Sequence, residues 1–181
     1  MSQKPLESFV RYCKTVQPQP YGQIKRFFEG VVCFPYDNEL LLQAHLFLNV
    51  HDVFHNCHEL LLFEKPPYGG YTNKGKCDFV YLTTDQRLLL VETKYIDLMS
   101  SGGTKRKRRN KHRNKVFEQV LGLKKIFCEH WGMPEQCIDC AVFTTDPHLS
   151  SRGAGLDVDA QFISIDELFD WQEQFKTFLE I

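Results

Sequence analysis

The chain has 181 residues, about the size of one domain, and its hydrophobic (43%) and aromatic (13%) contents are too high for a disordered protein. It lacks both the roughly 18 consecutive apolar residues of a membrane span and the apolar run of a secretory signal, so we expect an intracellular protein, cytoplasmic (nucleoid) or nuclear, without a membrane partner. The net charge is −1, yet eight of the 22 basic residues fall in residues 105–115, which contain no acid. The remaining 14 basic and 23 acidic residues give −9, so a polyanion is expected to bind only at this segment.

Helices are predicted for the first part of the chain. Apolar residues recur at helical spacing over residues 6–16 and again over 24–31, and prolines follow each run. A third helix is expected to begin after Asp37 or Asn38, since either side chain can cap it.

Three strands are predicted next. Residues 57–63 form a short apolar run, 66–75 are rich in turn residues, and 76–83 and 87–95 are strand-like segments joined by a tight turn at 84–86. This pattern predicts a three-strand meander.

Residues 100–114 are expected to be a mobile, charged connection, because they combine glycines with a dense run of basic residues. A long helix is predicted over 116–131, where apolar residues mark one face, and Gly132 is placed to end it.

Two further strands and a helix are predicted for the rest of the chain. The strands are expected over 139–145 and 160–165, separated by a loop that contains glycines. Ser164 and Glu167 have the spacing of a capping box at the start of a final helix.

Charged residues converge at one end of the predicted meander. Strand alternation places Glu92 and Lys94 on the same face of the third strand, and a three-residue turn at 84–86 places Asp78 directly opposite Glu92. Cross-strand partners have Cβ atoms about 5 Å apart, and like charges at that distance destabilise a sheet unless a cation lies between them. Two carboxylates with room for water suit Mg²⁺ or Mn²⁺.

The segment GKCDFVYLTTDQRLLLVETKY resembles the core motif of the PD-(D/E)xK nucleases, a restriction-endonuclease-like superfamily, with Asp78 as its first acid and Glu92-Thr93-Lys94 as its ExK. One departure is Cys77, at a position that is often Pro in that family. The resemblance implies an α/β fold with a restriction-endonuclease-like core, a mixed central β-sheet (αβββαβ) flanked by helices. The resemblance covers roughly residues 37–146, which would form the catalytic core. Since the length fits one domain, we expect a single nuclease-like domain over 1–181, with an N-terminal helical extension (1–36) and a C-terminal strand and helix (147–181).

The same resemblance implies roles for the motif. Asp78, Glu92 and the backbone carbonyl of Thr93 would hold Mg²⁺ or Mn²⁺, and Lys94 would orient or deprotonate the attacking water. Members of the family often add an acid from the preceding helix, which makes Glu39 a candidate metal ligand and catalytic residue. The alternative for Glu39 is a helix-start carboxylate favoured by the helix dipole.

A polar residue on the helix after the ExK strand also faces the site in many members. Gln119, four residues after Lys115, fits that role, although Leu123 stands where the exonuclease-like branch has an aromatic residue.

The basic run is the expected nucleic-acid contact, because lysines and arginines neutralise phosphates without reading sequence. The alternatives are a solvated, disordered loop or a nuclear-localisation signal. The candidate contact residues are Lys105, Arg106, Lys107, Arg108, Arg109, Lys111, Arg113 and Lys115.

Two histidine and cysteine clusters raise a zinc alternative, but neither has the paired spacing of a common zinc finger. Buried structural thiols are the preferred interpretation of the cysteines, whose odd number argues against a disulfide scaffold. The clusters are His51, His55 and His58 with Cys57, and Cys128, Cys137 and Cys140 with His130.

We therefore predict a metal-dependent nuclease, an endo- or exodeoxyribonuclease with little intrinsic sequence specificity. The expected partner is DNA, with RNA left open, and a second copy of the chain or a partner protein would supply specificity. The alternative is a non-catalytic nucleic-acid-binding or assembly protein that uses the basic loop 105–115.

Overall fold

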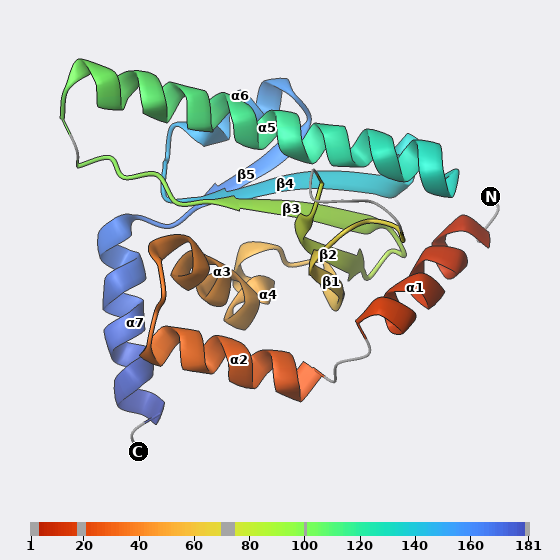
Figure 1. The fold of residues 1–181 in the computed structure, drawn as a ribbon, viewed down its shortest axis with the longest axis horizontal. Coiled ribbons are helices and arrows are strands. Elements are labelled where there is room, and N and C mark those ends of the chain that lie inside the picture. Colours follow the sequence, from red (N-terminus) through yellow and green to blue (C-terminus); the bar gives the residue numbers. More distant parts are fainter. Residues whose placement is uncertain (1–3, 18–20, 70–74, 100, 180–181) are drawn as a thin grey trace.

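A computed structural model describes residues 4–17, 21–69, 75–99 and 101–179. At its centre is a five-stranded mixed sheet with the strand order β1-β2-β3-β4-β5 (Figure 1). The first three strands are antiparallel neighbours, and β4 and β5 run parallel to β3. The strands are β1 (Cys57–Lys65), β2 (Cys77–Thr83), β3 (Leu88–Lys94), β4 (Ile138–Thr144) and β5 (Val158–Phe162).

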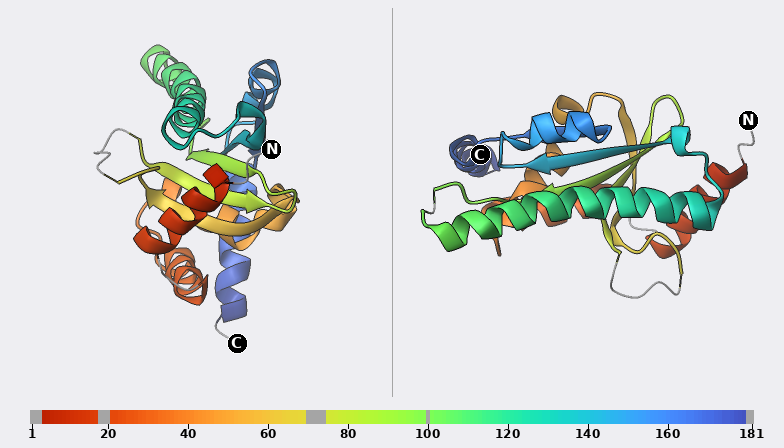
Figure 2. Two further views of the ribbon diagram at one scale, coloured as in Figure 1. Left: turned by 90° about the vertical axis from the view of Figure 1, so that its right-hand side faces the viewer. Right: turned by 90° about the horizontal axis from the view of Figure 1, so that it is seen from above.

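Helices cover both faces of the sheet. Figure 2 shows α5 and α6 on one side and α2 and α7 on the other. In the part of the chain that is described, no helix is both long and apolar enough to cross a membrane. The helices are α1 (Lys4–Val16), α2 (Tyr21–Cys33), α3 (Asn38–Leu48), α4 (Val50–Val53), α5 (Gly103–Trp131), α6 (Leu149–Gly155) and α7 (Ile165–Leu179), and a 3₁₀ turn spans Glu135–Cys137. The mixed α/β architecture and the αβββαβ order from α3 to β4 are confirmed.

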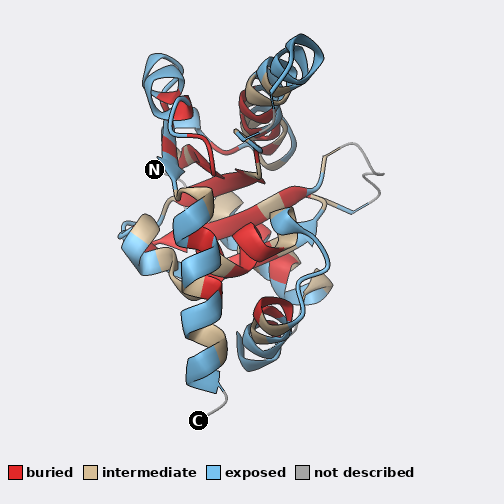
Figure 3. Cartoon of the chain, turned by 90° about the vertical axis from the view of Figure 1, so that its left-hand side faces the viewer, coloured by how far each residue is buried: buried red, intermediate tan, exposed pale blue. Residues whose placement is uncertain are grey.

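Strand alternation divides the core into two clusters. On the α5 side, Leu90 of β3 packs in the same cluster as Val116 and Val120 of α5. On the other side, Val91 packs in the same cluster as Leu41 of α3. The predicted alternation of side chains between the two faces of β3 is therefore confirmed for Leu88 to Val91. The buried sheet stands out between exposed helix surfaces in Figure 3.

The hairpin between β2 and β3 has the predicted three-residue turn. Thr83 N–H donates to the carbonyl of Arg87 at 2.9 Å, and Gln86 takes the left-handed conformation (φ 61°) that such a turn needs at its third position. The regular pairing runs from Leu82 and Leu88 to Phe79 and Val91, and Asp78 and Glu92 follow it on the two strands.

Local capping signals are also confirmed. The Asp37 side chain accepts from the N–H of Leu40 at 2.7 Å and caps α3. Ser164 and Glu167 form the reciprocal capping box of α7, with bonds of 3.0 and 3.1 Å. Gly132 ends α5 in the left-handed conformation (φ 65°), where a residue without Cβ is unstrained.

The expectation of a loop over 100–114 is wrong within the described residues, because α5 begins at Gly103 and includes the whole basic run. Lysine and arginine are good helix formers, and a helix that is already packed over 116–131 extends by one hydrogen bond for each added residue. Figure 1 shows the first turns of α5 extending past the end of β3.

Two smaller predictions also need correction. The last strand covers Val158–Phe162 and not 160–165, because the capping box at Ser164 starts α7 sooner than the apolar pattern indicates. The predicted loop before it contains α6, which approaches β5 closely: a Cβ added to Gly153 would lie 2.5 Å from the carbonyl oxygen of Val158. Of the predicted loop 66–75, residues 70–74 lie outside the described residues.

The first strand is irregular. Its register against β2 shifts between Cys57 and Glu59 and again between Leu60 and Leu62. Near its end, Glu64 takes a left-handed conformation (φ 48°) that is uncommon for a residue other than glycine. Such irregularities bend a strand and change the direction of its side chains.

Candidate functional site

Asp78 and Glu92 lie on the neighbouring strands β2 and β3, directly after the last regular pair of the hairpin, Phe79 and Val91. The backbone N–H of Asp78 donates to Glu92 Oε1 at 3.4 Å. Asp78 Oδ2 in turn accepts from Thr93, at 2.8 Å from its N–H and 2.7 Å from its hydroxyl.

Both carboxyl groups lie in surroundings that disfavour their charge. Glu92 is only 4% exposed, and burial, followed by the charge of Asp78, raises its pKa well above the usual range. Burial also raises the pKa of Asp78 to about 6, although the two hydrogen bonds from Thr93 oppose the rise. A cation between these groups would remove the cost that raises both pKa values.

Lys94 and Glu39 form an ion pair at the end of β3. Lys94 Nζ donates to the two carboxylate oxygens of Glu39 at 2.8 and 3.1 Å, and the N–H of Tyr95 lies 3.4 Å from Glu39 Oε2. Because Asp37 caps α3, Glu39 is held in the first turn of that helix. The structure thus brings Glu39 to the motif as the partner of Lys94, beyond the role of an isolated helix-start carboxylate.

Two further side chains at the site were missed by the sequence reasoning. Glu64 of β1 lies between residues that pair with β2, beside Asp78, and its charge contributes to the raised pKa of that group. The buried Gln43 donates to Glu64 Oε1 at 3.5 Å. The only available signal was the position of Gln43, one helical turn after Glu39; the strand pattern gave none for Glu64.

His112 of α5 is a third such residue. It is half-buried, and burial lowers its pKa, with the charge of Lys94 as the next cause. The negative charge of Glu39 acts on it in the opposite direction, so His112 lies within electrostatic reach of both members of the ion pair.

The donor set fits a hard divalent cation in its chemistry. In the described parts of the chain, no three His, Cys, Asp or Glu side chains are grouped to hold a metal ion by themselves. Asp78 and Glu92 supply two carboxylates, and the carbonyl of Thr93 is the predicted third oxygen. Mg²⁺ binds proteins through one or two carboxylates and keeps several waters, so a site with few protein ligands suits it.

Gln119 lies on the exposed side of α5, beside a cavity of about 720 Å³. Lys115 and Lys76 line the same cavity, and Lys76 is two residues before Asp78. The structure therefore groups Gln119 with two lysines along an approach to β2. Among the described residues, Gln119 makes no hydrogen bond to Asp78 or Glu92.

Most of the candidate nucleic-acid residues are exposed on the first turns of α5. Arg113 differs, because its side chain is 16% exposed and pairs with the fully buried Asp146 that follows β4. Arg109 is half-buried. The exposed members are Lys105, Arg106, Lys107, Arg108, Lys111 and Lys115.

The histidine and cysteine clusters show no zinc geometry among the described residues. Cys57 and Cys140 are buried, and Cys128 and Cys137 are half-buried. All seven cysteines are free thiols, as expected for a reduced core.

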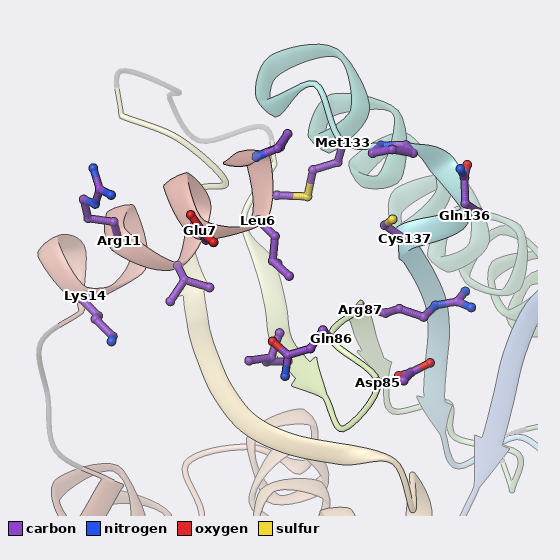
Figure 4. Close-up of a pocket in the computed structure, with 14 residues that line it drawn as sticks. Leu6, Glu7, Arg11, Lys14, Asp85, Gln86, Arg87, Met133, Gln136 and Cys137 are labelled. Atoms are coloured by element: carbon purple, nitrogen blue, oxygen red, sulfur yellow. The ribbon is translucent and has the colours of Figure 1, made fainter. Parts of the chain in front are cut away.

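A separate cavity of about 820 Å³ lies at the other end of the sheet (Figure 4). It is lined by α1, the β2–β3 turn and the segment after α5, including Leu6, Arg87 and Met133. Glu92 is five residues beyond Arg87, so about 17 Å of strand separates it from this side of the cavity.

No family model matches this chain, and no curated protein matches its sequence. Solved structures match part of it. One is described as an EndoMS–dsDNA2 complex, with 11% identity and a TM-score of 0.46 over 70% of this chain and 44% of that chain. Another is a repair endonuclease from Pyrococcus abyssi, with 13% identity and a TM-score of 0.46 over 71% and 48%. The match thus spans less than half the length of these proteins.

Proposed function

We propose that the protein is a metal-dependent nuclease that hydrolyses phosphodiester bonds of DNA with little intrinsic sequence specificity. The observation that carries the proposal is the contact between Asp78 and Glu92 across the hairpin, with the Lys94 ammonium at the end of the strand that carries Glu92. Two neighbouring acids of raised pKa, Glu92 buried and Asp78 half-buried, lower stability when charged unless a cation binds between them.

In this proposal Asp78, Glu92 and the Thr93 carbonyl hold Mg²⁺ or Mn²⁺. The ion, when bound, would lower the pKa of a coordinated water and stabilise charge on the phosphate. Thr93 orients the Asp78 carboxylate through two hydrogen bonds to one oxygen, which leaves the other oxygen, Oδ1, for the ion.

Lys94 orients the attacking water. An ammonium has three donors and no acceptor, and two of its donors already point to Glu39. The third is left for the water or for a phosphate oxygen. Glu39 acts through Lys94 as a positioning residue, since it fixes where that third donor points.

The exposed basic residues of α5 would hold the flanking phosphates. Such contacts give affinity without sequence preference, so specificity would come from a second copy of the chain or from a partner protein. Gln119, Lys115 and Lys76 would extend the contact along the cavity beside β2.

The test incubates the wild type and Lys94→Ala with supercoiled, linear and single-stranded DNA and with RNA, in Mg²⁺, Mn²⁺ or a chelator. We expect metal-dependent cleavage of DNA by the wild type and a loss of about 10²-fold or more in Lys94→Ala, with DNA affinity retained. Lys125→Ala is the matched control, because that lysine is exposed on the far part of α5. Binding without cleavage by the wild type under every condition would favour the non-catalytic alternative.

A further inference from the structure

Large apolar side chains are exposed at the edge of the molecule where β3 ends. Phe34 is 86% exposed and Tyr36 is 90% exposed, in the connection between α2 and α3. Met99, in the connection between β3 and α5, is 87% exposed. Figure 3 looks onto this edge, with α7 in front and much of the surface around it exposed. Exposed aromatic residues so close together are typical of a binding surface.

The two aromatic residues immediately precede the helix that carries Glu39 of the ion pair. Tyr36 is three residues before Glu39, which places their Cα atoms within about 11 Å of each other. Glu39 contacts Lys94, and the charges of Lys94 and of Arg108 both act on His112 of α5. The exposed aromatics and the basic turns of α5 therefore flank the Lys94–Glu39 pair.

We propose that Phe34 and Tyr36 stack against unpaired bases, so that the substrate class is DNA with a single-stranded segment. This inference rests on the proposed function of the same site. The faces of duplex bases are covered by their neighbours, whereas those of unpaired bases are free to stack on an aromatic ring. The adjacent basic helix complements the charge of the strand that carries these bases.

The local backbone limits the cost of such stacking. Pro35 lies between the two aromatic residues and fixes its own φ, and the Asp37 cap holds the start of α3 directly after Tyr36. Since little freedom remains to be lost in this segment, more of the stacking free energy is available for binding.

The experiment measures the affinity of the full chain by fluorescence anisotropy at fixed salt, with a chelator present so that no strand is cut. The probes are a labelled single-stranded oligonucleotide, the blunt duplex of the same sequence, and the single strand with a run of abasic nucleotides. We expect the wild type to bind the normal single strand more tightly than the abasic strand. The double variant Phe34→Ala/Tyr36→Ala should lose about tenfold or more in affinity for the normal single strand and keep its affinity for the other two probes.

Phe178→Ala is the control, because Phe178 is 72% exposed near the end of α7, where Figure 1 shows the helix furthest from α5. It should leave all three affinities unchanged. Equal losses for normal and abasic strands, or no loss for any probe, would overturn the inference. So would a change of oligomeric state in the double variant with unchanged affinity, since the aromatics would then contact a second copy.

The measurement contains no cleavage step, so the two proposals fail separately. A wild type that cuts nothing but prefers normal single strands through Phe34 and Tyr36 contradicts the nuclease and leaves the stacking inference intact. If the wild type cuts DNA but the double variant binds every probe with unaltered affinity, only the stacking inference is contradicted.

Discussion

Asp78 and Glu92 face each other across the β2–β3 hairpin, and the N–H of one residue lies 3.4 Å from the carboxylate of the other. Glu92 is buried and Asp78 is half-buried, so water screens the two charges less than it would at the surface. Burial therefore raises the free energy of the charged form of each acid, and the charge of Asp78 adds to that cost at Glu92.

The first prediction concerns pH. The pKa of Asp78 is about 6 in the folded protein against 3.8 ordinarily, so the folded state binds more protons than the unfolded state between those values. The free energy of unfolding of the metal-free protein should fall as pH rises through this window, by an amount on the order of 3 kcal/mol from Asp78. Glu92 adds a fall in the same direction that continues to higher pH.

Urea denaturation at a series of pH values checks this. Asp78→Asn keeps an acceptor for Thr93 and removes the charge, so it should flatten the curve and raise stability at neutral pH. A wild-type protein whose stability rises across the same window would contradict the burial of these charges.

The second prediction concerns metal binding. A divalent ion binds the deprotonated carboxylates and competes with protons, so Mg²⁺ or Mn²⁺ should raise Tm more at about pH 7.5 than at about pH 5. Differential scanning fluorimetry with and without the ion measures this. Asp78→Asn should lose most of the shift, whereas Asp159→Asn, on the exposed part of β5, should retain it. An equal shift in both variants would place the ion elsewhere.

The third prediction separates Arg113 from the other basic residues of α5. Its partner Asp146 is fully buried, so Arg113→Ala leaves an uncompensated carboxylate and should reduce the free energy of unfolding by about 3 kcal/mol. Lys107→Ala, at an exposed position, should change stability little and weaken DNA binding instead. Adding Asp146→Asn to Arg113→Ala should restore part of the stability, and failure to do so would contradict the ion pair.

The fourth prediction concerns the first turns of α5. Positive charges near a helix N-terminus and like charges four residues apart both destabilise a helix, and Gly102 at the N-cap has no side chain to offset them. Amide hydrogens over 105–110 should exchange faster than those over 117–127 in the free protein, and DNA should slow them selectively. Equal protection of both segments without DNA would contradict this account.

Local and short-range features of the fold were predictable from the sequence. The hairpin register follows from a three-residue turn, and the caps at Asp37, Gly132 and Ser164 follow from side-chain chemistry within a few residues. The facing of Asp78 and Glu92 is a direct consequence of that register. It could be predicted because it involves only one hairpin.

Features set by contacts between distant elements were not predictable. The basic run is helical because the packed part of α5 extends into it, against the electrostatic preference of its own residues. The position of Glu64 depends on the irregular register of β1, which no periodic pattern encodes. The Arg113–Asp146 pair joins α5 to the end of β4, 33 residues away.

The irregular register of β1 also bears on how the sheet ends. An outer strand with regular spacing offers a row of free backbone groups to which another strand can add. Two shifts along β1 break that row, and the opposite outer strand, β5, has only five residues, two of them, Asp159 and Gln161, exposed and polar. Growth of the sheet by a sixth strand is therefore discouraged at both borders, so self-assembly should use helix surfaces and the protein should resist fibril formation.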